Sequence, residues 1–276
     1  TKYKNLKVKA YQAEDEIAGI CSAIGASFAG AMACTSTSGP GLSLKSEAIG
    51  LAVMTELPLV IVDVQRGGPS TGLPTKTEQS DLTQALFGRN GEAPCIVVAA
   101  SSSANCFYWA FEAARLSLET MTPTILLTDG YLGNGSQLFR IPKMADLPKI
   151  NPPFATPNDP NYAPYNRDPE TLVRQWALPG MDGLRHRIGG LEKLSGKGSV
   201  STDSANHQQM VKFRKEKVER VANRIPNQEV EGAESADLLV VGWGGTEGAL
   251  RCAVQELQAE GKSIAFTQFN YIMPLP

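Results

Sequence analysis

The sequence predicts an α/β fold in which helices cover both faces of a parallel sheet. Short apolar segments alternate along the first half of the chain with longer segments of helical periodicity. The apolar segments carry hydrophobic residues at successive positions, as strands do when both faces of a parallel sheet are covered. The 276 residues are 42% hydrophobic and 20% charged, which is enough apolar material for a sizeable core.

Five strands are expected in the first part of the chain: residues 6–11, 31–35, 57–64, 96–100 and 124–128. Helices should separate them, the first at about 14–30 and the second at about 43–56. A third helix is indicated by apolar residues at helical spacing: Phe107, Ala110, Phe111, Ala114 and Leu118. A turn rich in glycine, serine and threonine at 35–41 opens the second helix.

The second half of the chain has a different organisation. Prolines recur through 141–204 with aromatic residues between them, which indicates a loop-rich connection rather than disorder. A helix is expected at 205–225. A second α/β unit follows, with a strand at 238–241, a tight turn, a helix at 247–260 and a strand at 263–268. The sequence therefore predicts a first domain at 1–140, a connection with a linker helix at 141–230, and the start of a second domain at 231–276.

Charge, cysteine spacing and hydropathy exclude several classes of protein. A net charge of −2 gives no basis for nucleic-acid binding, and the lysines at 2, 4, 7 and 9 fit a solvated edge. No apolar segment reaches the roughly 18 residues of a membrane span, and no signal peptide is visible, so a cytoplasmic protein is expected. The five cysteines form no C-x-x-C pair, which predicts free buried thiols and no iron–sulfur or zinc site in this chain.

Three polar segments lie at junctions between expected strands and the elements that follow them. Residues 14–16 open the first expected helix, residues 35–41 follow the second expected strand, and residues 65–76 follow the third. Ligands of open parallel sheets bind outside the carboxyl ends of the strands, so these segments should form one site. Glu16 is the leading catalytic candidate, although an acid at a helix start is also explained by the helix dipole. Arg66 suits a carboxylate ligand. A structural ion pair of Arg66 with Asp63 or Asp81 is the alternative.

Other candidate motifs have simpler explanations. The turn at 242–246 resembles a dinucleotide fingerprint but has Glu247 in place of the third glycine, so packing explains it better. Asp129 and Gly130 are interpreted as a turn. His186 and His207 lie in the connection, away from any pattern of nucleophilic catalysis, and a structural or surface role is expected for them.

Long segments of the chain resemble the alpha subunit of the 2-oxoacid:ferredoxin oxidoreductases, especially its 2-oxoglutarate branch. The resemblance covers nearly the whole chain, and its most specific segments are TSGPGLSL at 37–44 and VDVQRGGPSTGLPTKTEQSDL at 62–82. It implies a first domain that binds the aminopyrimidine end of thiamine diphosphate, and a second unit like the transketolase C-terminal domain. The Y-P-I-T-P-S loop of the family is absent and should precede residue 1. Both ends of the chain are therefore expected to be cut, with the first strand and helix missing.

The resemblance also assigns roles to residues. The family's conserved glutamate corresponds to Glu16, and Ser38 and Gly39 belong to the cofactor-binding turn. The arginine that binds the substrate carboxylate corresponds to Arg66, with Ser70, Thr71 and Lys76 in the same loop. Lys76 is one source of the second cation that a dicarboxylate substrate needs, and a basic residue of the partner is the other.

The activity implied is oxidative decarboxylation of 2-oxoglutarate, or a related 2-oxo acid, to acyl-CoA and CO2 with reduction of ferredoxin. A beta subunit is expected to hold the magnesium ion, the diphosphate and an iron–sulfur cluster. Branched-chain 2-oxo acids remain open as substrates. The alternatives are a thiamine-diphosphate subunit of an NAD-linked 2-oxoacid dehydrogenase or transketolase-like enzyme, and a non-catalytic assembly subunit.

Overall fold

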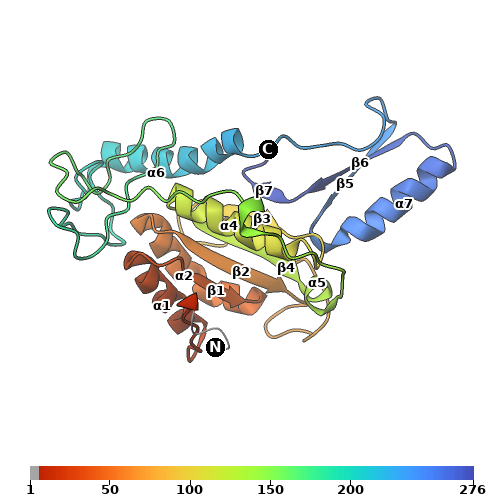
Figure 1. The fold of residues 1–276 in the computed structure, drawn as a ribbon, viewed down its shortest axis with the longest axis horizontal. Helices are drawn as coiled ribbons and strands as arrows, with labels where there is room; N and C mark the ends of the chain where they lie inside the picture. The colour runs from red at the N-terminus through yellow and green to blue at the C-terminus, as the bar shows by residue number, and fades with distance from the viewer. Residues whose placement is uncertain (1–5) are drawn as a thin grey trace.

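The computed structural model describes residues 6–276, which form a five-stranded sheet and a smaller two-stranded sheet (Figure 1). The larger sheet has the order β1-β2-β4-β3-β7. Its strands are β1 (Cys34–Thr37), β2 (Leu59–Gln65), β4 (Pro123–Asp129), β3 (Ile96–Ala99) and β7 (Tyr271–Met273). The first four are parallel to one another, and β7 runs antiparallel beside β3. The expected parallel α/β sheet is confirmed, with one antiparallel edge strand added.

Seven α-helices connect and cover the strands in the described residues: α1 (Glu16–Phe28), α2 (Gly39–Thr55), α3 (Leu82–Phe87), α4 (Cys106–Thr120), α5 (Gly130–Asn134), α6 (Ser204–Glu219) and α7 (Glu247–Ala259). Short 3-10 helices occur at η2 (Met144–Asp146), η3 (Arg220–Arg224) and η4 (Gly244–Thr246). The long helices agree with the sequence periodicity to within a few residues, whereas α3 and α5 are too short for a periodic signal.

The strands bury both of their faces, as the continuous apolar segments predicted. Ile61, Ile125 and other alternate strand residues pack with α1 and α2 in one core cluster. Val60 and Leu126, which point to the opposite face, pack with α4, α6 and η3 in a second cluster. Both clusters are almost fully removed from water, so the sheet is the rigid layer from which the strand-end loops project.

The prediction of a strand at 6–11 is wrong. Residues 8–13 have no regular secondary structure, and Leu6, Val8 and Tyr11 are largely exposed. An alternating pattern makes a strand only where a neighbouring strand supplies hydrogen bonds, and none of the described strands lies beside this segment. Of the four N-terminal lysines, Lys2 and Lys4 lie outside the described residues, and the other two are exposed.

The connection at 141–203 is anchored to the end of α2 by a buried charge cluster around Glu56. The carboxylate of Glu56, only 2% exposed, accepts a hydrogen bond from Lys217 Nζ at 2.9 Å and one from Arg167. These cations lower the pKa of Glu56 to about 2, against the effect of its burial. Helix α6 and the connection therefore dock on the end of α2 through ion pairs as well as apolar contacts.

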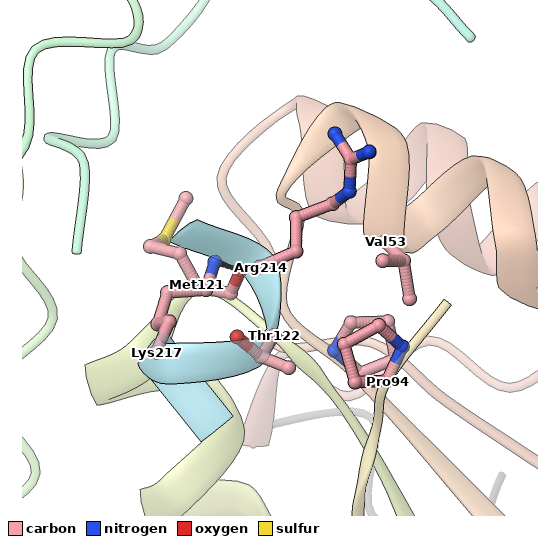
Figure 2. A pocket seen from close by; sticks show the side chains of 7 residues that line it. Val53, Pro94, Met121, Thr122, Arg214 and Lys217 are labelled. Atoms are coloured by element: carbon pink, nitrogen blue, oxygen red, sulfur yellow. Dashed lines mark hydrogen bonds between the residues drawn. The ribbon is translucent and has the colours of Figure 1, made fainter. Parts of the chain in front are cut away.

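A small pocket lies where α6 meets this core (Figure 2). Its lining comes from several elements: Val53, Pro94, Met121, Thr122, Pro123, Arg214 and Lys217. The larger sheet and the helices and loops around it contribute five of these residues, and α6 contributes the two cations. None of the predicted site residues lines this pocket.

The second α/β unit consists of β5 (Leu238–Trp243), α7 and β6 (Ile264–Phe269), with the two strands parallel. It lies beside the larger sheet in Figure 1 and contacts the ends of its strands. Gln79 Nε2 donates to Trp243 O at 3.2 Å, and a Cβ on Gly245 would lie 2.4 Å from Asp129 Oδ2. Close packing therefore explains the glycine-rich turn at 242–246. Within residues 6–276, no helix has the length and apolar character required to cross a bilayer.

Candidate functional site

The predicted site residues lie at the edge of the sheet where β1 and β2 end. The register pairs Thr37 of β1 with Asp63 of β2, and Gln65 of β2 with Asp129 of β4. Parallel strands deliver their carboxyl ends to one edge, so the turn after β1 and the loop after β2 are neighbours.

Helix α1 begins at this edge because its N-terminus is capped. The Asp15 side chain accepts a hydrogen bond from Ala18 N at 2.7 Å, which satisfies one of the free donors of the first turn. Glu16 is thereby the first helical residue and is partly buried. An acidic residue does stabilise this helix start, as the alternative explanation of Glu16 proposed. The capping residue is Asp15, however, and not Glu16.

Glycines in the turn after β1 let Glu16 pack against the backbone of α2. A Cβ on Gly41 would lie 2.8 Å from Glu16 Cγ and 1.8 Å from Thr37 Oγ1. A Cβ on Gly39 would lie 2.6 Å from Asp81 Oδ1. A Cβ at either position would force these side chains to move, so glycine permits the close approach. Ser38 is the N-cap residue of α2, but its side chain forms no capping hydrogen bond.

The Glu16 carboxylate forms no hydrogen bond or ion pair with residues 6–276, whereas its backbone carbonyl does. Lys45 of α2, only 1% exposed, donates from Nζ to Glu16 O at 2.7 Å. Burial lowers the pKa of Lys45, and the nearby Glu16 and Asp15 carboxylates oppose this effect. The arrangement fixes the main chain of Glu16 and leaves its carboxylate available to a ligand.

The loop that follows β2 folds back on itself. Gly67 N donates to Lys76 O at 2.9 Å, and Leu73 N donates to Gly67 O at 2.8 Å. Gly68 N also donates to Glu78 Oε2 at 3.0 Å. Arg66 and Lys76 are therefore together at the base of this loop, while Ser70 and Thr71 are exposed at its tip.

Arg66 has an orphaned donor at this base. Its Nε is buried and has no acceptor among residues 6–276, and the guanidinium forms no ion pair with Asp63 or Asp81. The structural ion pair considered from the sequence is thus absent. Glu16, Ser38 and Gly39 therefore share one corner, Arg66 and Lys76 share the loop base, and Ser70 and Thr71 lie at the exposed tip.

Sequence reasoning missed three residues at this edge: Lys45, Asp63 and Asp81. Lys45 stands at helical spacing from Leu42, Ile49 and Ala52, all of which are buried, so a lysine on the apolar face of the helix was readable as a signal. The two aspartates were noticed only as possible partners of Arg66. They instead face each other, with Asp63 fully buried.

Several weaker predictions also have outcomes. All five cysteines are free, but only Cys95 is buried, and Cys21, Cys34 and Cys252 are exposed. Asp129 does not form a simple turn; its side chain accepts from Tyr131 N and Leu132 N and caps the short helix α5. The two histidines have structural contacts: His207 Nδ1 lies 2.8 Å from Glu192 Oε2, and His186 Nδ1 lies 2.8 Å from Leu184 O.

Comparison with known proteins decides the family. Residues 2–203 match the family model described as pyruvate flavodoxin/ferredoxin oxidoreductase, thiamine diphosphate-binding. The 2-oxoglutarate synthase subunit KorA of Methanothermobacter thermautotrophicus is 34% identical over 265 residues, which are 96% of this chain and 69% of that protein. The chain belongs to the 2-oxoacid:ferredoxin oxidoreductase alpha subunits.

Two further oxidoreductase proteins are more similar to this chain in sequence. The 2-oxoglutarate oxidoreductase subunit KorA of Mycobacterium tuberculosis is 52% identical over 277 residues, covering 100% of this chain and 42% of that protein. A solved 2-oxoglutarate:ferredoxin oxidoreductase from Magnetococcus marinus, with 2-oxoglutarate, coenzyme A and succinyl-CoA bound, superposes with a TM-score of 0.94 at 39% identity. That comparison covers 99% of this chain and 47% of the solved chain. The chain thus spans less than half of two of these oxidoreductase subunits.

The Lys45 contact predicts a local effect on α1 of the oxidoreductase subunit. In Lys45→Met, the Glu16 carbonyl loses its charged donor, and we expect the backbone amides of the first α1 turn to exchange with solvent roughly tenfold faster. Mass-spectrometric hydrogen exchange measures this change, with Ser46→Ala on the same helix as the control. Equal protection of α1 in both variants would show that Lys45 does not hold this helix start.

Proposed function

We propose that this chain is the pyrimidine-binding part of an alpha subunit that oxidatively decarboxylates 2-oxoglutarate, or a related 2-oxo acid, to acyl-CoA and CO2 with reduction of ferredoxin. The observation that carries the proposal is the unpartnered Glu16 carboxylate at a glycine-lined corner of a family member. The relatives named for 2-oxoglutarate support this substrate, and the orphaned Arg66 donor supports a carboxylate ligand.

The residues at this corner fit the aminopyrimidine end of thiamine diphosphate. Glu16 offers a free carboxylate, and the Ser38–Gly39 turn brings main chain rather than side chains to the same place. The cofactor, when bound, supplies the carbon nucleophile for attack on the 2-oxo group. Glu16 would share a proton with the pyrimidine N1′, which makes the amino group of the ring a better base.

Arg66 would hold the C1 carboxylate of the substrate through a bidentate pair. Its position directly after a rigid buried strand fixes the guanidinium, and its buried Nε lacks any other acceptor in residues 6–276. Lys76, at the base of the same loop, is one source of charge for the distal carboxylate of a dicarboxylic substrate. Ser70 and Thr71 would close over the substrate from the exposed loop tip.

The remaining groups of the reaction would come from a partner. A beta subunit would hold the magnesium ion, the diphosphate and the iron–sulfur cluster, and the complex would use coenzyme A and ferredoxin in the cytoplasm. The relatives are themselves named as subunits, which supports a hetero-oligomer. The two electrons released per 2-oxo acid would leave singly to ferredoxin.

The division into domains at 1–140, 141–230 and 231–276 is part of the same proposal. Separate core clusters support it, because Val254, Ile264 and Phe266 pack around α7 away from the clusters of the larger sheet. Strand β7 nevertheless lies in the larger sheet, so the last residues of the chain pack on the first domain.

The substrate role of Arg66 is tested by Arg66→Lys in the assembled complex. A lysine keeps the charge but cannot form the bidentate pair, so we expect KM for the 2-oxo acid to rise by about tenfold or more. Steady-state ferredoxin reduction measures KM and kcat, with Arg89→Lys as the matched control because Arg89 bonds only to main-chain carbonyls near α3. Unchanged KM and kcat in Arg66→Lys would remove Arg66 from the substrate site.

The same assay separates the competing activities. Ferredoxin reduction that depends on coenzyme A, by a complex with a brown iron–sulfur partner, supports the proposal. NADH production would instead favour the NAD-linked dehydrogenase, and an inert complex would favour an assembly subunit.

A further inference from the structure

A buried pair of carboxyl groups lies behind the candidate site and has no role in the function proposed above. Asp63 is a residue of β2 and is 0% exposed, and Asp81 immediately precedes α3 and is 8% exposed. The two carboxyl groups lie within hydrogen-bonding reach of each other. The pair therefore links the central sheet to the end of the loop that begins at Arg66.

No cation compensates this pair. Neither carboxylate forms an ion pair among residues 6–276, and both oxygens of Asp63 lack any N–H or hydroxyl donor there. The one further charged group that acts on Asp81 is Glu78, which is another acid. Two ionised carboxylates in this position would repel each other without screening, so the hydrogen bond between them requires a proton.

Burial and the neighbouring Asp81 raise the pKa of Asp63 to about 8, and burial also raises the pKa of Asp81. The proton belongs on Asp63, the more deeply buried of the two, so Asp63 donates and the Asp81 carboxylate accepts. The Asp81 carboxylate in turn lies against Gly39, at the positive N-terminal end of α2.

The position of Asp81 connects the pair to the loop and to the turn at once. Asp81 N donates to Gln65 Oε1 at 3.1 Å, and Gln65 Nε2 donates to Thr128 O at 3.2 Å. The aspartate is therefore held by its main chain to β2 and by its side chain to Asp63 and to the start of α2. Release of the side chain would remove one of these attachments and loosen the C-terminal end of segment 66–81.

We propose that Asp63 and Asp81 share one proton, and that this shared proton holds segment 66–81 against the N-terminus of α2. Both are positioning residues, because their carboxyl groups act on each other and on the N-terminus of α2. Loss of the proton makes the two carboxylates repel each other and loosens the segment. The consequence for Arg66 and substrate rests on the proposed function, whereas the shared proton and the loosening do not.

The sign of the pH effect follows from the raised pKa. Above the ordinary pKa of an aspartate, near 4, the unfolded chain ionises Asp63 while the folded protein keeps it protonated. Stability from this pair is therefore complete in acid, falls from about pH 4 to about pH 8, and then becomes constant. Loosening of the segment accompanies ionisation of the folded protein, around pH 8.

Asp63→Asn is the decisive variant, because its amide donates to Asp81 at every pH without a change of shape. Between pH 5 and 8, we expect the Tm of the full-length wild type to fall relative to that of Asp63→Asn by about 5 °C or more. Asp81→Asn places the permanent donor on the other residue and should give the same result. The exposed Asp182→Asn is the matched control and should follow the wild type.

Limited trypsin cleavage at the exposed Lys76 measures the segment itself. The rate of wild-type cleavage, divided by the rate for Asp63→Asn at the same pH, should rise several-fold from pH 7 to pH 9. This ratio removes the pH dependence of trypsin itself, because Asp63→Asn keeps its donor at every pH. Parallel Tm curves of wild type and Asp63→Asn would overturn the shared proton. If the Tm curves of the wild type and Asp63→Asn differ but their cleavage rates depend on pH in the same way, the shared proton does not hold segment 66–81. Neither measurement needs thiamine diphosphate or turnover, so failure here is distinct from failure of the proposed function.

Discussion

In a complex that contains Glu16→Gln, exchange of the thiamine diphosphate C2 proton with solvent should slow by about 10²-fold or more. A glutamine keeps the size and one acceptor of the glutamate but cannot hold the proton that the carboxylate would share with N1′. The amino group of the pyrimidine then remains a weak base. Quenched-flow deuterium exchange followed by NMR measures the rate directly, without ferredoxin, coenzyme A or substrate.

Two controls isolate the role of the Glu16 carboxylate. Binding of thiamine diphosphate should change little, because the turn at Ser38 and Gly39 is intact in the variant and titration calorimetry can measure its affinity. Glu14→Gln removes an exposed acid two residues away and should exchange at the wild-type rate. An unchanged exchange rate in Glu16→Gln would take the catalytic role away from this residue.

The location of the candidate site was predictable because it depends on local signals. Asp15 and Glu16 precede a helical pattern, Ser38 precedes another, and Arg66 ends a continuous apolar strand. Parallel strands then bring such residues to one edge, whatever the details of their packing. The same local signals produced the bounds of α1, β2 and α4 to within a few residues.

What the sequence could not predict depends on partners that are distant in the chain. Strand β7 has three residues and exists because Val97 and Val98 of β3 offer it an edge about 175 positions earlier. The segment at 6–11 shows the reverse case, in which a strand-like pattern has no such edge. Lys45 was overlooked for a related reason. Its burial makes sense only once the Glu16 carbonyl, on another helix, is seen to accept its hydrogen bond.

Glu56 shows how a distant partner overrides a local rule. It is the C-cap residue of α2 and has left-handed backbone angles, φ 49° and ψ 56°, which favour glycine. A glutamate is present there because its side chain meets the buried Lys217 and Arg167, which come from α6 and the connection. The ion pairs thus compensate for an unfavourable backbone conformation at the helix end.

Glu56→Gln should destabilise the protein by about 3–5 kcal/mol, the cost of removing one partner from a buried ion pair. Lys217 is 5% exposed at its side chain, and Glu56 is its one ion-pair partner among residues 6–276, so the variant leaves an uncompensated charge in the core. Chemical denaturation of the full-length protein measures the loss.

The pH dependence of stability should change as well, because the pKa of Glu56 is lowered to about 2 in the folded state. Wild-type stability from this group is complete above about pH 5 and is lost as the pH falls toward 2, whereas Glu56→Gln lacks this acid-dependent loss.

The double variant Glu56→Met with Lys217→Met distinguishes the loss of the ion pair from a simple packing defect. Removing both charges leaves no unpaired Lys217 ammonium, so the double variant should be more stable than the sum of the two single effects predicts. Arg167 loses its Glu56 partner in the double variant and keeps its contact with the Tyr165 carbonyl, so the recovery is incomplete. Additive effects of the two substitutions would show that Glu56 and Lys217 contribute independently, and that their ion pair does not hold α6 to the end of α2.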